Sequence, residues 1–117
     1  MTKVIVKTGH WLPRHLNVLA ITLGTTVYCA LSHPSPRLLV HECQHVRQFV
    51  RQRHSRWLFF TKYLGDYLRA RIMANHSHLE AYLGIGAEEE AREMAWRYET
   101  VAAWSDGERF PVHVVMQ

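Results

Sequence analysis

The chain has 117 residues, of which 48% are hydrophobic and 21% charged, and its formal net charge is +4. This length and composition suit a single packed domain, residues 1–117, and exclude a disordered tail. The apolar runs are too short for a membrane span or a signal peptide, so we expect a cytoplasmic protein in which Cys29 and Cys43 are free thiols.

The first third of the chain is rich in β-branched residues, which favours strands. We expect strands at 3–8, 18–23 and 25–31, with Gly24 separating the last two. The prolines of His33-Pro34-Ser35-Pro36 then end the strand pattern.

Ser35 and Pro36 predict the start of a helix, because serine caps the first N–H groups and proline suits the first helical position. From there to about residue 54, apolar side chains recur at the spacing of one helix face. These are Leu39, Cys43, Val46 and Val50. Cys43 is thereby expected to pack in the core.

The rest of the chain predicts two more helices, at 56–74 and 87–104, and a strand-like tail at 109–116. We expect the tail to pair with the sheet rather than to lie in a cleft. Because strands precede helices, the predicted fold class is α+β, with a small N-terminal sheet followed by three helices.

The segment His41-Glu42-Cys43-Gln44-His45 is an H-E-x-x-H motif on the first predicted helix. Residues four apart lie on the same helix face, so both imidazoles can bind one zinc ion. Glu42 is rotated about 100° from His41, beside the ion, where it can accept a proton from a zinc-activated water. The motif predicts a zinc site with Glu42 as general base.

A zinc site of this kind needs a third protein ligand and an open position for water. The third predicted helix begins with Glu88-Glu89-Glu90-Ala91, which fits the pattern E-x-x-A. In this pattern the first glutamate binds the metal and the alanine lets the helix approach closely. Glu88 is the first candidate, Glu90 the second and Glu80 a more distant third.

The H-E-x-x-H motif, Tyr63-Leu64 and the later E-x-x-A together resemble the gluzincins, a class of zinc metallopeptidases. The closest resemblance is to the minigluzincins, which are single domains of about this length. It covers roughly residues 16 to 98. It implies a minimal zincin-like fold, in which an active-site helix, a backing helix and a glutamate helix follow the sheet.

Carried onto this chain, the resemblance implies one zinc ion held by His41, His45 and Glu88, with Glu42 as general base in peptide-bond hydrolysis. It also implies a peptide or protein substrate bound in extended form along an edge strand. We expect that strand to lie within Thr25 to Leu31.

The chain departs from the family pattern after the glutamate motif. Many gluzincins have an aspartate after the alanine, where this chain has Arg92. The group that supports a zinc-binding histidine must then come from elsewhere, and the candidates are Asp66, Glu99 or a backbone carbonyl. Tyr82 and His78 are candidates for contacts with the substrate or the transition state.

Two alternatives to an active peptidase follow from the same residues. The first is a latent or inactive zinc-binding module that acts in protein interaction. The second, more remote, is a basic helical nucleic-acid binder with an accidental motif. Arg47 and Arg51 are predicted to share an outer helix face with Gln44, which favours a solvated face over nucleic-acid binding.

Overall fold

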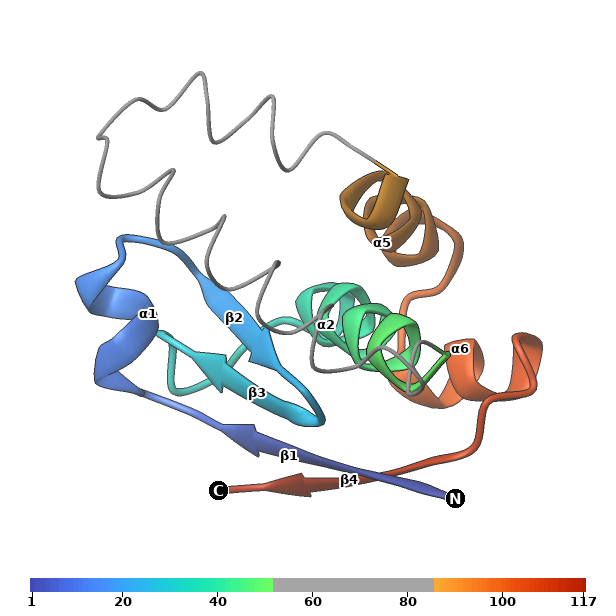
Figure 1. The fold of residues 1–117 in the computed structure, drawn as a ribbon, viewed down its shortest axis with the longest axis horizontal. Coiled ribbons are helices and arrows are strands. Elements are labelled where there is room, and N and C mark those ends of the chain that lie inside the picture. Colours follow the sequence, from blue (N-terminus) through green and yellow to red (C-terminus); the bar gives the residue numbers. More distant parts are fainter. Residues whose placement is uncertain (52–85) are drawn as a thin grey trace.

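The structure is a computed structural model that describes residues 1–51 and 86–117 (Figure 1). Within these ranges the fold is α+β, as predicted, with a four-stranded mixed sheet and helices on it. The helix predicted at 56–74 and the last residues of the one predicted at 36–54 lie outside the described residues.

All the predicted strands are present: the first is shifted by one residue at the predicted length, and the other three are shorter than predicted. They are β1 (Thr2–Lys7), β2 (Ala20–Leu23), β3 (Thr26–Cys29) and, from the tail, β4 (Val112–Met116). The strand order is β2-β3-β1-β4. β1 pairs in parallel with both β3 and β4, whereas β2 and β3 form an antiparallel hairpin. The tail therefore extends the sheet, as predicted.

The expected edge strand is wrong. The segment Thr26–Cys29 is flanked by β2 on one side and β1 on the other, so β3 has no open edge. The edge nearest the helices is β2, and Gly24, with φ +69°, makes its tight turn into β3. β3 is not an edge strand because β1, which is distant from it in sequence, pairs with β3 and not with β2.

A short helix that the sequence pattern did not predict, α1 (Trp11–His15), connects β1 to β2. Its first turn is capped by His10, whose Nδ1 accepts a hydrogen bond of 3.1 Å from the Leu12 N–H. Five residues are too few to show a helical period, which is why the pattern missed it.

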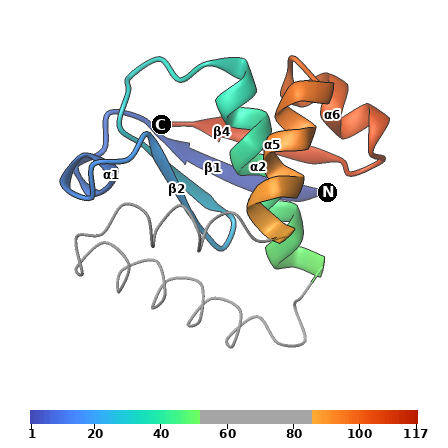
Figure 2. The same ribbon diagram turned by 90° about the horizontal axis from the view of Figure 1, so that it is seen from above.

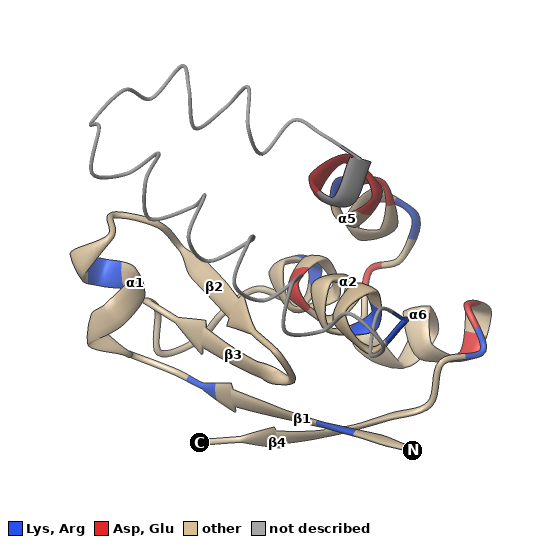
Figure 3. Ribbon diagram, viewed as in Figure 1, with Lys and Arg blue, Asp and Glu red and all other residues tan. Residues whose placement is uncertain are grey.

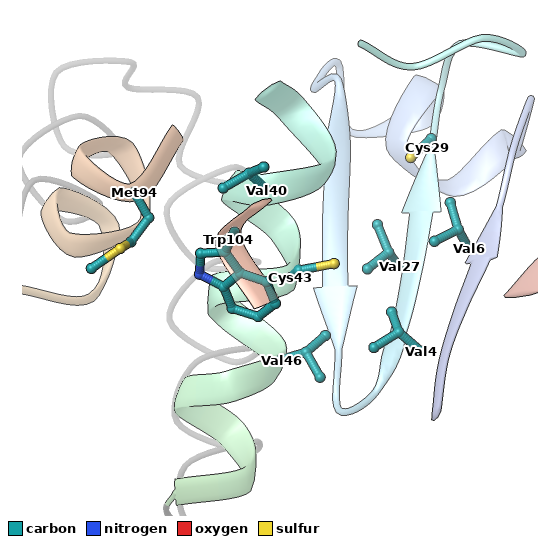
Figure 4. Packing of buried hydrophobic residues seen from close by; sticks show 9 residues of the cluster. All are labelled: Val4, Val6, Val27, Cys29, Val40, Cys43, Val46, Met94 and Trp104. Atoms are coloured by element: carbon teal, nitrogen blue, oxygen red, sulfur yellow. The ribbon is translucent and has the colours of Figure 1, made fainter. Parts of the chain in front are cut away.

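The predicted first helix is α2 (Pro36–Arg51), and its N-cap is the one predicted. The Leu38 N–H donates to Ser35 Oγ at 3.2 Å. Cys43 and Val46 pack between α2 and the strands, and Trp104 packs against the same helix (Figure 4). α2 is thereby fixed across the sheet, with one face left for the next helix.

The predicted solvated face of α2 is confirmed for Arg51, whose side chain is 50% exposed, but is wrong for Gln44 and Arg47. Gln44 is completely buried, and the Arg47 side chain is only 13% exposed. Arg47 pairs with Glu108 at 3.1 Å, while the Gln44 Oε1 accepts a hydrogen bond of 2.9 Å from Trp104 Nε1. Helices further along the chain cover this face, so its polar residues make contacts within the protein.

The single helix predicted at 87–104 is in fact two, α5 (Gly86–Arg97) and α6 (Val101–Gly107). Thr100 caps α6 by accepting from the Ala103 N–H at 3.1 Å. The Arg37 Nη1 donates to the carbonyls of Ala95 at 2.6 Å and Trp96 at 3.2 Å. In a continuous helix these carbonyls would accept hydrogen bonds from the N–H groups four residues further along. Arg37 takes the place of those donors, so this contact helps to end α5.

Figure 2 shows α5 lying alongside α2, and Figure 1 shows α5 on the side of α2 away from β4. The charged residues gather on the helices, whereas β2 and β3 carry none (Figure 3). None of the helices in the described part of the chain is long and apolar enough to cross a membrane.

Candidate metal centre

His41 and His45 lie one turn apart on the face of α2 that meets α5. Their ring centroids are 5.1 Å apart, and the rings are inclined at 73°. The neighbouring Cys43 points to the sheet, where burial, reinforced by the negative charge of Glu42, raises the pKa of its thiol to about 12. The thiol therefore stays protonated and does not compete as a metal ligand.

Glu88, in the first turn of α5, contacts both imidazoles. Its Oε1 lies 2.6 Å from His41 Nε2, and its Oε2 lies 2.9 Å from His45 Nε2. Ala91, one turn further along α5, is fully buried. A small side chain at this position lets α5 come close enough to α2 for the carboxylate to bridge the two rings.

These three residues offer a donor set that suits zinc. Two imidazole nitrogens and one carboxylate oxygen lie within 4.8 Å of one another. Tetrahedral zinc with bonds of about 2.1 Å places its ligand atoms roughly 3.4 Å apart. If the Glu88 oxygens moved away from the two imidazole nitrogens by less than about 1 Å, their separations would match those of ligands around one zinc ion.

The cluster is closed on one side and open on the other. The His45 side chain is 6% exposed, whereas those of His41 and Glu88 are 16% and 19% exposed. A ligand entering from solvent would thus approach past His41 and Glu88. This asymmetry matches a catalytic zinc site, which keeps one position open, better than a closed structural one.

His45 is oriented by a residue that the sequence analysis did not single out. Its Nδ1 donates to Gln48 Oε1 at 2.8 Å, which leaves Nε2 facing Glu88. The partner lies one turn along the same helix, so the i, i+3 spacing was a signal available in the sequence.

Gln48 is itself tied to α5. Its Nε2 donates to Glu90 Oε1 at 3.3 Å, and Gln44 donates to the same oxygen. Glu90, the second candidate for the third ligand, therefore binds these amides and Arg51 instead of joining the metal cluster.

The electrostatics of the cluster couple the two rings to the carboxylate. Burial of the His45 imidazole lowers its pKa. The hydrogen bond to Glu88 and the charge of Glu42 raise this pKa by more than burial lowers it, so it is raised overall, to about 9. Burial raises the pKa of Glu88, but its hydrogen bonds with His41 and His45 lower it to about 2. The raised pKa of His45 and the lowered pKa of Glu88 favour a protonated imidazole against an ionised carboxylate, so a cation binding here would compete with a proton.

Glu42 is buried beside the cluster and is held by the edge strand. The Thr22 hydroxyl, on β2, donates to Glu42 Oε2 at 2.6 Å. Glu42 is close enough to His45 for its charge to raise the pKa of that imidazole. Thr22 is thus a second residue near the site that the sequence analysis did not identify.

The remaining predicted site residues divide into two groups. Glu99 is not at the cluster: its side chain is 82% exposed and pairs with Arg37 at 3.4 Å. Asp66, His78, Glu80 and Tyr82 lie outside the described residues. Comparisons with protein-family models, curated proteins and solved structures find no match for this chain.

Proposed function

We propose that this protein is a zinc-dependent peptidase of the gluzincin type. The observation that carries the proposal is the position of Glu88, which reaches both imidazoles of the H-E-x-x-H motif from a separate helix. The residue that makes this contact is the one that the E-x-x-A pattern indicated as the third ligand. Glu42, buried beside the cluster, adds a candidate proton acceptor to the three possible metal ligands.

His41, His45 and Glu88 would hold the metal. A zinc ion supplies Lewis acidity at such a site, where it polarises a carbonyl and lowers the pKa of water to about 7. Glu42 would accept the proton of the attacking water and deliver it to the leaving amine. The Thr22 hydroxyl holds one oxygen of this carboxylate and leaves Oε1 to take the proton.

The substrate would bind in extended form along β2, which replaces the strand first expected. The Ala30 N–H donates to the Leu19 carbonyl at 2.8 Å, so the backbone N–H and C=O groups of Leu19 face β3. Along a strand, successive residues direct these groups to opposite sides. Ala20 and Thr22 thereby direct their N–H and C=O groups away from β3. A peptide pairing there would lie next to Glu42.

The proposed location is the cytoplasm. Cys29 and Cys43 are both buried, and neither forms a disulfide. Free buried thiols are usual in reducing compartments.

The exchange Glu42→Gln tests the proposed chemistry. It keeps the size of the side chain and its acceptor for Thr22 but removes the proton acceptor. We expect cleavage of an unfolded test protein to fall roughly 10²–10⁴-fold with zinc content unchanged. The exposed Glu89→Gln provides the same chemical change on α5 and should cleave at the wild-type rate.

Two results would count against a peptidase. If wild-type protein holds one zinc ion per chain and cleaves neither unfolded proteins nor a peptide library, the fold serves as a zinc-binding interaction module. If Glu42→Gln cleaves as fast as wild type, another group is the base or the activity is a contaminant.

A further inference from the structure

A pocket of about 330 Å³ adjoins the candidate metal centre on the side of His41. The described residues that line it come from α2 and α5: Arg37, His41, Arg92, Ala95 and Trp96. His41 belongs to both places, so a molecule bound at the metal centre could extend into the pocket. Two arginines and an exposed tryptophan give this pocket a basic and aromatic wall.

Arg92 is the first reason to expect an anionic ligand. It is exposed, lies one turn after Glu88 on α5, and makes no ion pair with any residue in the ranges 1–51 and 86–117. Of the acids one turn before it on that helix face, Glu88 has both carboxylate oxygens against the histidines, and the exposed Glu89 makes no described ion pair with Arg92. A guanidinium group is therefore left at the pocket without a described ion-pair partner.

Arg37 is the second reason, because its position is fixed. Its Nη1 bonds to the two carbonyls that end α5, and its guanidinium lies over the Trp96 ring, 5.8 Å from the centroid. Its described acidic partner, Glu99, is 82% exposed and 3.4 Å away. Such an exposed pair contributes little, and an incoming anion could replace it.

We propose that this pocket binds a carboxylate group of the peptide substrate, so that the enzyme selects substrates with a negative charge close to the scissile bond. The proposal rests on the proposed peptidase function. Arginine pairs with carboxylates through charge-assisted, often bidentate hydrogen bonds, and Arg92 has donors to spare. Trp96, which is 82% exposed, offers a flat apolar surface to the rest of that residue.

The carboxylate has two possible sources, a free C-terminus or an acidic side chain. Both present the same group to the arginines. Four fluorescent hexapeptides separate them: one with a free C-terminus, its C-terminal amide, and amidated versions with a central Glu or Gln. Their affinity for the zinc-loaded Glu42→Gln protein, which should not cleave them, is measured by fluorescence anisotropy.

We expect the acid of at least one pair to bind about fivefold or more tightly than its neutral partner at low salt. The pair that shows the preference identifies the source of the carboxylate. Arg92→Gln should abolish the preference and leave the zinc content unchanged. Arg97→Gln is the matched control, because it removes the same charge from the same helix outside the pocket lining and should keep the preference.

Two outcomes would overturn the proposal. One is equal affinity for acid and neutral peptides in both pairs. The other is a preference that survives in Arg92→Gln, which would place the carboxylate on the metal or elsewhere. Zinc content and cleavage by the wild type are read separately, so a failure of the peptidase function is distinguished from a failure of the pocket.

Discussion

At the scale of single residues, His45 is held by two hydrogen bonds of different kinds. Its Nε2 meets a carboxylate that a metal can replace as a partner, whereas its Nδ1 is committed to Gln48. An imidazole that donates from both nitrogens is positively charged. Binding of a cation at Nε2 then leaves the ring in the same orientation but without its proton.

Replacing Gln48 tests this role. In Gln48→Leu the acceptor for His45 Nδ1 is lost, so the ring is held less firmly in the orientation that faces Glu88, and we expect zinc affinity to fall roughly 10–100-fold. Competition with a chromophoric chelator measures the affinity. Gln117→Leu makes the same change at the C-terminal residue and should bind zinc normally. Equal affinity in both variants would mean that Gln48 does not orient the ligand.

The charge of His45 predicts how metal-free stability depends on pH. The pKa of His45 is raised from 6.5 to about 9, so the folded protein holds this proton more tightly than the unfolded chain. The resulting stability is fully present below about pH 6.5 and is lost as the pH rises through 9. If zinc binds at Nε2 of His45, it displaces this proton, and this source of pH dependence is then lost.

We therefore expect the difference in melting temperature between zinc-loaded and chelator-treated protein to widen from pH 6 to pH 9. Thermal denaturation in matched buffers measures it. A constant difference over this range would show that zinc does not displace a proton from the site.

At this scale, local spacing predicted which groups approach one another, but not what holds them. The four-residue interval between His41 and His45 fixes their common face on any helix, and the E-x-x-A pattern indicated Glu88. The contact between Thr22 and Glu42 joins a strand to a helix that is distant in sequence. Such a contact depends on the packing of the whole sheet and has no local signal.

At the scale of elements, α6 supports the metal centre through α2. Trp104 on α6 is fully buried and donates to Gln44, which in turn donates to Glu90 on α5. One buried amide thus connects three helices. Cys43 and Gln44, between the two histidines of the motif, are therefore part of the core as well as of the motif.

The exchange Trp104→Phe removes the indole donor and leaves the buried Gln44 oxygen without it. We expect a loss in the free energy of unfolding of about 1–3 kcal/mol, from the unsatisfied acceptor and the lost volume. Urea denaturation of zinc-loaded protein measures it. The control is Trp96→Phe, an exposed tryptophan, which should change stability by less than about 0.5 kcal/mol. Similar losses in both variants would contradict this role for Trp104.

Element boundaries were predicted where the signal is local and missed where it is not. The Ser35 and Pro36 start signal placed the beginning of α2 correctly. The division between α5 and α6 was missed because helical periodicity continues through it. Thr100 was a possible cap, but the contact of Arg37 with the α5 carbonyls is visible only in three dimensions.

At the scale of the whole molecule, the sheet and two helices place an edge strand beside a potential metal site. β1 lies between β3 and β4, and β4 forms the edge of the sheet opposite β2 (Figure 1). α2 crosses the sheet near β2, and α5 packs on α2. Fold class followed from the order of strands and helices, but strand order did not, because parallel pairing joins segments distant in sequence.

The central claim is that His41, His45 and Glu88 bind one metal ion, and metal analysis tests it most directly. Protein purified without chelator, and metal-free protein reloaded with zinc, should each hold about one zinc ion per chain by mass spectrometry of the metal. Glu88→Ala should lose most of this zinc, whereas Glu89→Ala should retain it. A folded wild-type protein that neither contains zinc nor takes it up would contradict the account, as would a Glu88→Ala variant that binds zinc as tightly as wild type.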